Sequence, residues 1–152
     1  MAQICRAGHV IVYSLKVSPN SRKTFCDKCG AATISECQTC GWPIVGEPYA
    51  PLGGGGPYQA PKYCEECGKP FPWTEMALSA AKEYTDDLDQ LSAEEKTALK
   101  ATFDDLTSDT ARTPLAANRF KNFVTKLGPV AGDALAKIIV NVATEAAKRL
   151  FL

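Results

Sequence analysis

The chain lacks a long apolar segment and an excess of charge of one sign. In its apolar C-terminal third, the longest run without a charged residue extends only from Ile138 to Thr144, whereas a membrane-spanning helix needs roughly 20 apolar residues. Lys and Arg together number 17, as do Asp and Glu, so no general attraction to nucleic acid is predicted. The opening residues, MAQICRAGHV, show no charged region followed by a long apolar stretch. We therefore expect neither a transmembrane segment nor a signal peptide.

Cysteine is absent from residues 68–152, because all seven cysteines lie in the first 67 residues together with the only histidine. An odd cysteine count argues against a complete disulfide framework. Seven cysteines and one histidine make eight ligands, enough for two tetrahedral zinc sites. They form one Cys-x-x-x-His pair and three Cys-x-x-Cys pairs: Cys5 with His9, Cys26 with Cys29, Cys37 with Cys40, and Cys64 with Cys67. The sequence therefore predicts two structural zinc ions per chain.

Glycine accompanies every one of these pairs. Gly30, Gly41 and Gly68 each follow a second cysteine, and Gly8 precedes His9. Glycine allows positive φ, so backbone N–H groups can turn toward thiolate sulfurs in a tight loop. A redox role would suit a single Cys-x-x-Cys pair, and an iron–sulfur cluster would suit four cysteines. The repeated pairs, the histidine and the glycines favour zinc over both.

Three pairings of these ligands into two sites are open. Only seven residues separate Cys29 from Cys37, and a short connection closes at low entropic cost. We therefore predict a nested pairing, with Cys26, Cys29, Cys37 and Cys40 in one site and Cys5, His9, Cys64 and Cys67 in the other. The first alternative is a cross-brace, in which Cys5 and His9 join Cys37 and Cys40. The second is a sequential pairing.

Both predicted sites are closed. Each has four protein ligands and leaves no position for a water molecule, which is typical of structural rather than catalytic zinc. Seven thiolates and two divalent zinc ions would lower the net charge from zero to about −3. The metal-bound protein is therefore expected to be mildly acidic.

The fold predicted from the pattern is a small α+β protein with two domains. Residues 1–72 would form a two-zinc ribbon module with short β-hairpins, including a strand at 9–17. Residues 43–63 hold five prolines, three tyrosines and the run Gly53–Gly56, which predicts a loop with a flexible centre. Residues 73–152 would form a helical domain.

Four helices are predicted in that second domain, at about 74–88, 92–106, 113–127 and 129–150. Ser92 and Glu95 make a capping box, and Thr113-Pro114 is expected to start the third helix. Gly128 is expected to end that helix. The fourth helix carries a wide apolar face formed by Leu135, Ile138, Ile139, Val142, Ala143, Ala146 and Leu150. So broad a face predicts self-association or a partner surface, unless the other three helices bury it.

The segments ICRAGHVI, FCDKCGAATISECQTCG and YCEECGKPFPWTE resemble a bacterial zinc-ribbon family of unknown function. The resemblance covers about the first 75 residues. It implies a bacterial, cytoplasmic protein with zinc-bound cysteines and supplies no activity.

Two functions follow from these features. The first is a zinc-stabilised interaction or adaptor protein that acts through protein–protein contacts. The alternative is a nucleic-acid- or ribosome-associated zinc ribbon, for which five residues could form a basic edge: Arg6, Lys16, Arg22, Lys23 and Lys28. Catalysis is not expected, because the ligand assignment uses every cysteine and the histidine and leaves no recognisable motif.

Overall fold

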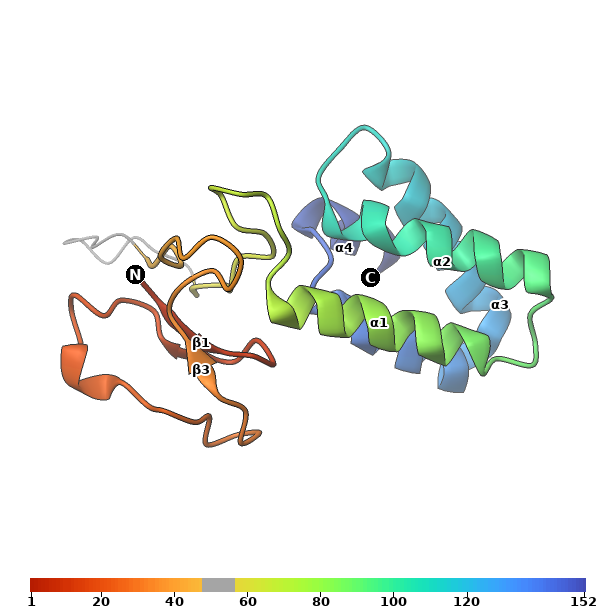
Figure 1. The fold of residues 1–152 in the computed structure, drawn as a ribbon. Coiled ribbons are helices and arrows are strands. Elements are labelled where there is room, and N and C mark those ends of the chain that lie inside the picture. Colours follow the sequence, from red (N-terminus) through yellow and green to blue (C-terminus); the bar gives the residue numbers. More distant parts are fainter. Residues whose placement is uncertain (48–56) are drawn as a thin grey trace. The chain divides into compact units, whose positions relative to one another are not determined.

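The computed structural model describes residues 1–47 and 57–152 and forms two compact units, Met1–Glu75 and Met76–Leu152 (Figure 1). The division falls inside a helix, slightly after the boundary predicted at residue 72. The first unit holds β1 (Gln3–Cys5), β2 (Val10–Val12), a 3₁₀ turn (Pro19–Ser21) and β3 (Thr33–Ile34). The helices that follow are α1 (Pro72–Asp86), α2 (Ala93–Thr107), α3 (Thr113–Val140) and α4 (Glu145–Phe151). This order confirms the predicted α+β class.

The three strands form one antiparallel sheet in the order β2-β1-β3. The central strand, β1, was not predicted, whereas the strand predicted at 9–17 is shortened to β2. Register pairs Ile4 with Ile34 and Cys5 with Thr33. Cys5 is therefore held beside β3, the strand that follows Cys26 and Cys29.

A small apolar core supports this sheet. Ile4 and Ile44 are almost completely buried, and Phe71 stacks on Trp73 with ring centroids 4.8 Å apart. The remaining buried members are Ala2, Ile34, Cys37 and Cys64. Two of these, Cys37 and Cys64, are candidate metal ligands, so the apolar core is continuous with part of the predicted metal-binding region.

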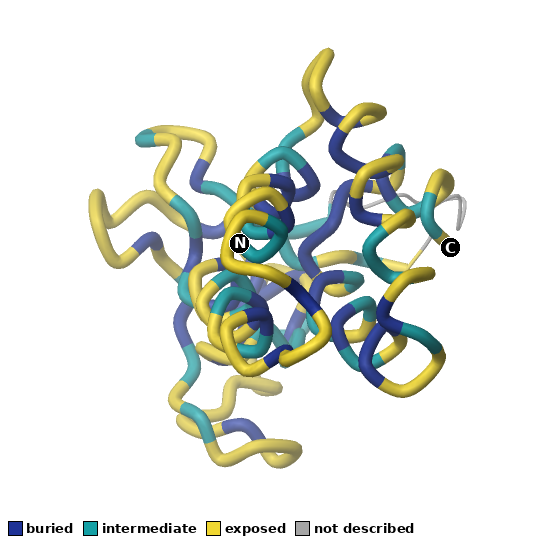
Figure 2. The backbone as a smooth tube through the Cα atoms, turned by 90° about the vertical axis from the view of Figure 1, so that its right-hand side faces the viewer, coloured by how far each residue is buried: buried dark blue, intermediate teal, exposed yellow. Residues whose placement is uncertain are grey.

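The second unit has a larger core, built mainly from apolar side chains and containing none of the candidate metal ligands. Phe103, Phe120 and Phe151 meet edge to face, and Leu99, Leu106 and Leu135 are fully buried beside them. In Figure 2 the buried residues are dark blue, and they alternate with exposed residues along the coiled parts of the tube. The capping box predicted at Ser92 and Glu95 is present at the start of α2. Helix α3 begins at Thr113, as expected, and Arg112 is its N-cap residue. The Thr113 hydroxyl donates to the Ser108 carbonyl.

The helix predicted at 129–150 is divided into two helices in the structure. Gly128 breaks the helical path with φ 83° and ψ 179°, as its position predicted, but the following helix ends at Val140. The backbone N–H of Thr144 then donates to the Leu106 carbonyl at 2.9 Å, and the Thr144 hydroxyl caps the short helix α4. A contact with α2 therefore interrupts an apolar pattern that looked continuous.

This arrangement buries most of the apolar face predicted for that helix. Leu135, Ile139 and Ala143 are fully buried, and Val142 is nearly so. Val130 and Leu152 are the apolar residues of this unit that stand furthest into solvent, at 84% and 78% exposure.

The loop predicted at 43–63 is described only in part. Its glycine run, Tyr49 and two of its prolines lie in 48–56, outside the described residues. Beyond that segment, the Tyr58 hydroxyl donates to the Val45 carbonyl, and burial raises the pKa of Tyr58 to about 12. Among residues 1–47 and 57–152, no helix combines the length and the apolarity needed to cross a membrane.

Replacing Gly128 with alanine should destabilise the second unit by about 1–3 kcal/mol, because its backbone conformation is almost exclusive to glycine. The effect is conformational rather than steric, since a Cβ at this position would meet nothing within 4 Å. Asn118→Ala, a change at an exposed position in the same helix, is the control. Its free energy of unfolding should stay within about 0.5 kcal/mol of the wild-type value. Thermal unfolding followed by circular dichroism measures both. Equal stabilities of the two variants would contradict the assigned strain.

Candidate metal centres

Each ligand pair lies at the tip of a tight turn with the same hydrogen bonds. In the pair at 26–29, the N–H of Gly30 donates to the Cys26 carbonyl, and the N–H of Cys26 donates to the Ala31 carbonyl. Equivalent bonds close the turns at 37–40 and 64–67, and a similar turn holds Cys5 and His9. All four accompanying glycines have positive φ, between 69° and 92°. The local role predicted for these glycines is therefore confirmed.

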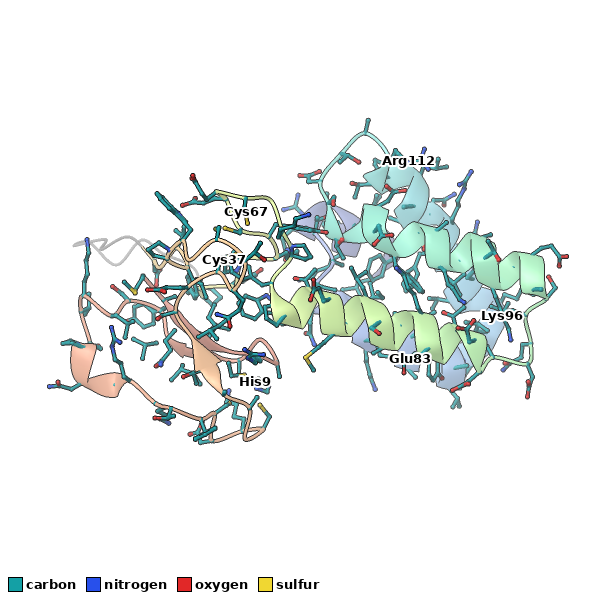
Figure 3. All side chains as sticks on the ribbon, in the orientation of Figure 1. His9, Cys37, Cys67, Glu83, Lys96 and Arg112 are labelled. Carbon is teal, nitrogen blue, oxygen red and sulfur yellow. The ribbon has the colours of Figure 1, made fainter. Side chains whose placement is uncertain are left out.

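The turns meet in two groups of four ligands. Site A contains Cys5, His9, Cys26 and Cys29, and site B contains Cys37, Cys40, Cys64 and Cys67. In each site, all four ligand atoms lie within 4.8 Å of one another. Figure 3 shows Cys37 and Cys67 close together and His9 well apart from them. All eight predicted ligands are thus brought into two sets of the predicted size.

The spacing of the ligand atoms fits one tetrahedral ion per site. Zinc–sulfur bonds of about 2.3 Å and zinc–nitrogen bonds of about 2.0–2.1 Å place neighbouring sulfurs about 3.8 Å apart, and sulfur and nitrogen about 3.6 Å apart. The observed Sγ–Sγ distances are 3.7 Å for Cys5–Cys29, Cys37–Cys67 and Cys40–Cys64. The Nδ1 atom of His9 lies 3.5 Å from Cys5 Sγ and 3.6 Å from Cys26 Sγ. Sulfurs at these separations are too far apart to be disulfides.

This grouping is the sequential one and corrects the nested pairing predicted from the sequence. The nested pairing relied on the short connection between Cys29 and Cys37, which was predicted to be a hairpin with its tip and return at 32–36. The structure instead uses Thr33–Ile34 as strand β3, and an extended chain advances about 3.3 Å per residue. The strand therefore carries the turn at 37–40 away from the turn at 26–29.

Strand β1 is what brings the two turns of site A together. Cys5 pairs with Thr33, and the N–H of Arg6 donates to the Ala32 carbonyl. The buried Gln3 side chain adds a second link, because its amide donates to the Lys23 carbonyl and its oxygen accepts from the Lys23 N–H, at 3.0 and 3.1 Å. The chain entering the turn at 26–29 is thus tied to the strand that ends at Cys5.

Gln3 and β1 were missed in the sequence because three residues are too few for a periodic pattern. Their one signal is position: a short, mostly apolar segment directly before a metal-ligand turn.

Site B is positioned by the chain on either side of its turns. After the turn at 37–40, the N–H of Ile44 donates to the Ser35 carbonyl, and the Ile44 carbonyl accepts from Ala2. The indole N–H of Trp42 donates to the Glu65 carboxylate at 3.1 Å, which links the two turns directly. The Trp42 side chain therefore joins the turn at 37–40 to the turn at 64–67.

Trp73 is the second tryptophan of the first unit, and it is buried. It is 6% exposed, and its indole N–H donates to the Pro61 carbonyl at 2.8 Å. A Cβ at Gly8 would lie 3.0 Å from the Trp73 Cβ. Glycine is therefore needed at position 8 both for its φ and for this close approach.

Backbone N–H groups favour a thiolate at one cysteine of each site. The N–H groups of Cys40 and Thr39 lower the pKa of Cys37 to about 6. At Cys26, burial raises the pKa, but the N–H groups of Lys28 and Cys29 lower it to about 7. In site B, the N–H of Trp42 lowers the pKa of Cys40, but burial and the neighbouring thiols raise it to about 12. A cation at the centre would reverse this last effect, because it favours every thiolate at once.

The chain belongs to the DUF2321 family, described as an uncharacterized protein conserved in bacteria, whose pattern matches residues 1–151. The match includes both the cysteine-bearing unit and the helices, so it extends beyond the segment that carried the resemblance. No curated protein and no solved structure matches the chain.

The sequential pairing predicts which double variants keep a metal ion. His9→Ala combined with Cys26→Ala should damage site A alone and retain about one ion per chain, because both residues belong to the same set. His9→Ala combined with Cys64→Ala should lose both ions. Elemental analysis of the purified proteins measures this directly. If the second combination retained one ion and the first retained none, the pairing assigned to the two sites would be wrong.

Proposed function

We propose that the protein is a zinc-stabilised interaction protein whose first unit is a rigid platform for protein–protein contacts. The observation that carries this proposal is that each site has four protein ligands at tetrahedral spacing. Such sites leave no position for substrate or water and act structurally. Zinc is the ion that best suits thiolate and imidazole ligands in a tetrahedron. Two zinc ions per chain follow from the two sites.

A non-catalytic role is part of this proposal. Sites A and B contain all seven cysteines and the only histidine. Any catalysis would have to rely on carboxylates, lysines, tyrosines and hydroxyls. A cytoplasmic location is also proposed, because reduced cysteines with metal-ligand spacing suit a reducing compartment.

A nucleic-acid-associated role is the second candidate, and one observation favours it. Residues 1–33 contain five basic residues but only one acidic residue, Asp27. The basic residues are those of the predicted basic edge, and all five are exposed. Asp27 is itself engaged by Lys23 at 2.9 Å. Phosphate groups would be the natural counterpart of this region.

Affinity purification from native lysate, with and without nuclease, should separate the two candidates. A protein partner should co-elute under both conditions if the platform role is right. Cys37→Ala is the matched control, because loss of site B should unfold the platform and release the partner. Retention only before nuclease treatment would replace the proposal with the nucleic-acid role. Wild type should also carry close to two zinc ions per chain.

Self-association through the C-terminal helices stays a prediction, but most of the apolar face predicted for it is buried, and Val130, outside that face, is the most exposed large apolar residue of this unit. Val130→Asp should leave a folded protein that no longer assembles, because this side chain is 84% exposed. Leu135→Asp should instead unfold the second unit at a cost of several kcal/mol, because it places a charge in the core. Circular dichroism with light scattering distinguishes these results. A wild-type protein that is monomeric at high concentration would rule out self-association.

A further inference from the structure

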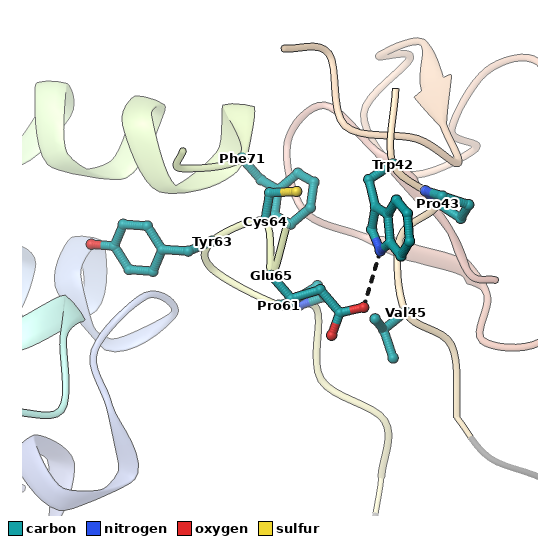
Figure 4. Close-up of a pocket in the computed structure, with 8 residues that line it drawn as sticks. All are labelled: Trp42, Pro43, Val45, Pro61, Tyr63, Cys64, Glu65 and Phe71. Atoms are coloured by element: carbon teal, nitrogen blue, oxygen red, sulfur yellow. Dashed lines mark hydrogen bonds between the residues drawn. The ribbon is translucent and has the colours of Figure 1, made fainter. Parts of the chain in front are cut away.

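The first unit has a pocket of about 140 Å³ over site B (Figure 4). Its wall is mostly apolar, and it includes one carboxylate. The lining residues are Trp42, Pro43, Val45, Pro61, Tyr63, Cys64, Glu65 and Phe71. The large indole of Trp42 is 44% exposed, and Val45 is 47% exposed. The Trp42 ring is therefore accessible to solvent beside the Glu65 carboxylate.

The hydrogen bond between Trp42 and Glu65 fixes the geometry of this wall. The indole N–H donates to Glu65 Oε1, so the carboxylate is held at the edge of the indole ring. This bond holds the carboxylate group of Glu65 close to the indole ring of Trp42. A planar cation can stack on an indole and hydrogen-bond to a carboxylate at the same time.

The charge around the pocket has the matching sign. Glu66 follows Glu65 in the exposed turn, and Glu36 pairs through its backbone with Pro43, a lining residue. Residues 34–75 contain five acidic and two basic residues, the opposite of residues 1–33. A divalent ion on the four thiolates of site B would leave a further net charge of −2 there.

We propose that this pocket binds an arginine side chain of a basic protein segment. The guanidinium would stack on Trp42 and pair with Glu65, while its methylene stem would pack on Pro43 and Val45. This inference rests on the proposed interaction role and names the chemistry of the partner. Arginine fits better than lysine, because its planar fork both stacks and pairs with a carboxylate.

The test uses the zinc-loaded full chain and a blocked alanine peptide with one central arginine. Nitrogen-15 NMR resolves the two indole N–H signals. Millimolar peptide should shift the signal of Trp42 and leave that of the buried Trp73 in place. The same peptide with citrulline, which is neutral and nearly isosteric, should bind about two- to fivefold more weakly. Absence of a Trp42 shift, or equal binding of the two peptides, overturns the proposal.

Matched variants locate the site. Glu65→Gln should weaken binding of the arginine peptide about two- to fivefold, and Trp42→Ala should weaken it at least as much. Glu66→Gln changes the net charge equally but lies outside the pocket lining, so its affinity should stay close to wild type. Equal losses in Glu65→Gln and Glu66→Gln would show a nonspecific charge effect and overturn the pocket. Because the lysate experiment does not depend on this pocket, its result separates failure of the arginine site from failure of the interaction role.

Discussion

The first unit depends on holding seven thiols and one imidazole in two groups of four. Ligand atoms this close repel one another once they are ionised, and only a cation at each centre offsets that repulsion. The apolar core beside them is small and includes Cys37 and Cys64. Structural zinc contributes apparent binding energies of about 10–16 kcal/mol in zinc-finger peptides, as large as the whole stability of a typical domain, about 5–15 kcal/mol. Metal binding and folding of this unit are therefore expected to be one event.

The two units rely on different sources of stability. The second has no metal ligands and is stabilised by a core of aromatic and aliphatic side chains around Phe103 and Phe120. A variant at Gly128 or Leu135 therefore reports on helix packing, whereas a variant at a cysteine reports on the metal sites. The first unit also has an uneven distribution of charge along its sequence. Basic residues are concentrated in residues 1–33 and acidic ones in residues 34–75, so the two parts of this small unit differ in the sign of their charge.

Local features were predictable from the sequence because their causes lie within a few residues. Each of the three Cys-x-x-Cys pairs in this chain is followed by glycine and folds into the same turn, since the hydrogen bonds that close it join nearby residues. The capping box at Ser92 and the break at Gly128 follow the same logic. The fourth helix failed for the opposite reason. Its interruption depends on a hydrogen bond from Thr144 to Leu106 in another helix, which no local periodicity contains.

Residue types and their spacing were enough to identify the eight candidate ligands, the number of sites and the division into a cysteine-rich half and a helical half. These features depend on residue type and spacing. Which candidate ligands share a site could be read only from the folded chain, because it depends on β1 lying beside β3 and on the hydrogen bonds between the Gln3 side chain and the Lys23 backbone. The same holds for the pocket over site B, whose central bond joins Trp42 to Glu65 across 23 positions of sequence. Spacing identifies ligands, but strand pairing brings them together, and strand pairing is a property of the folded chain.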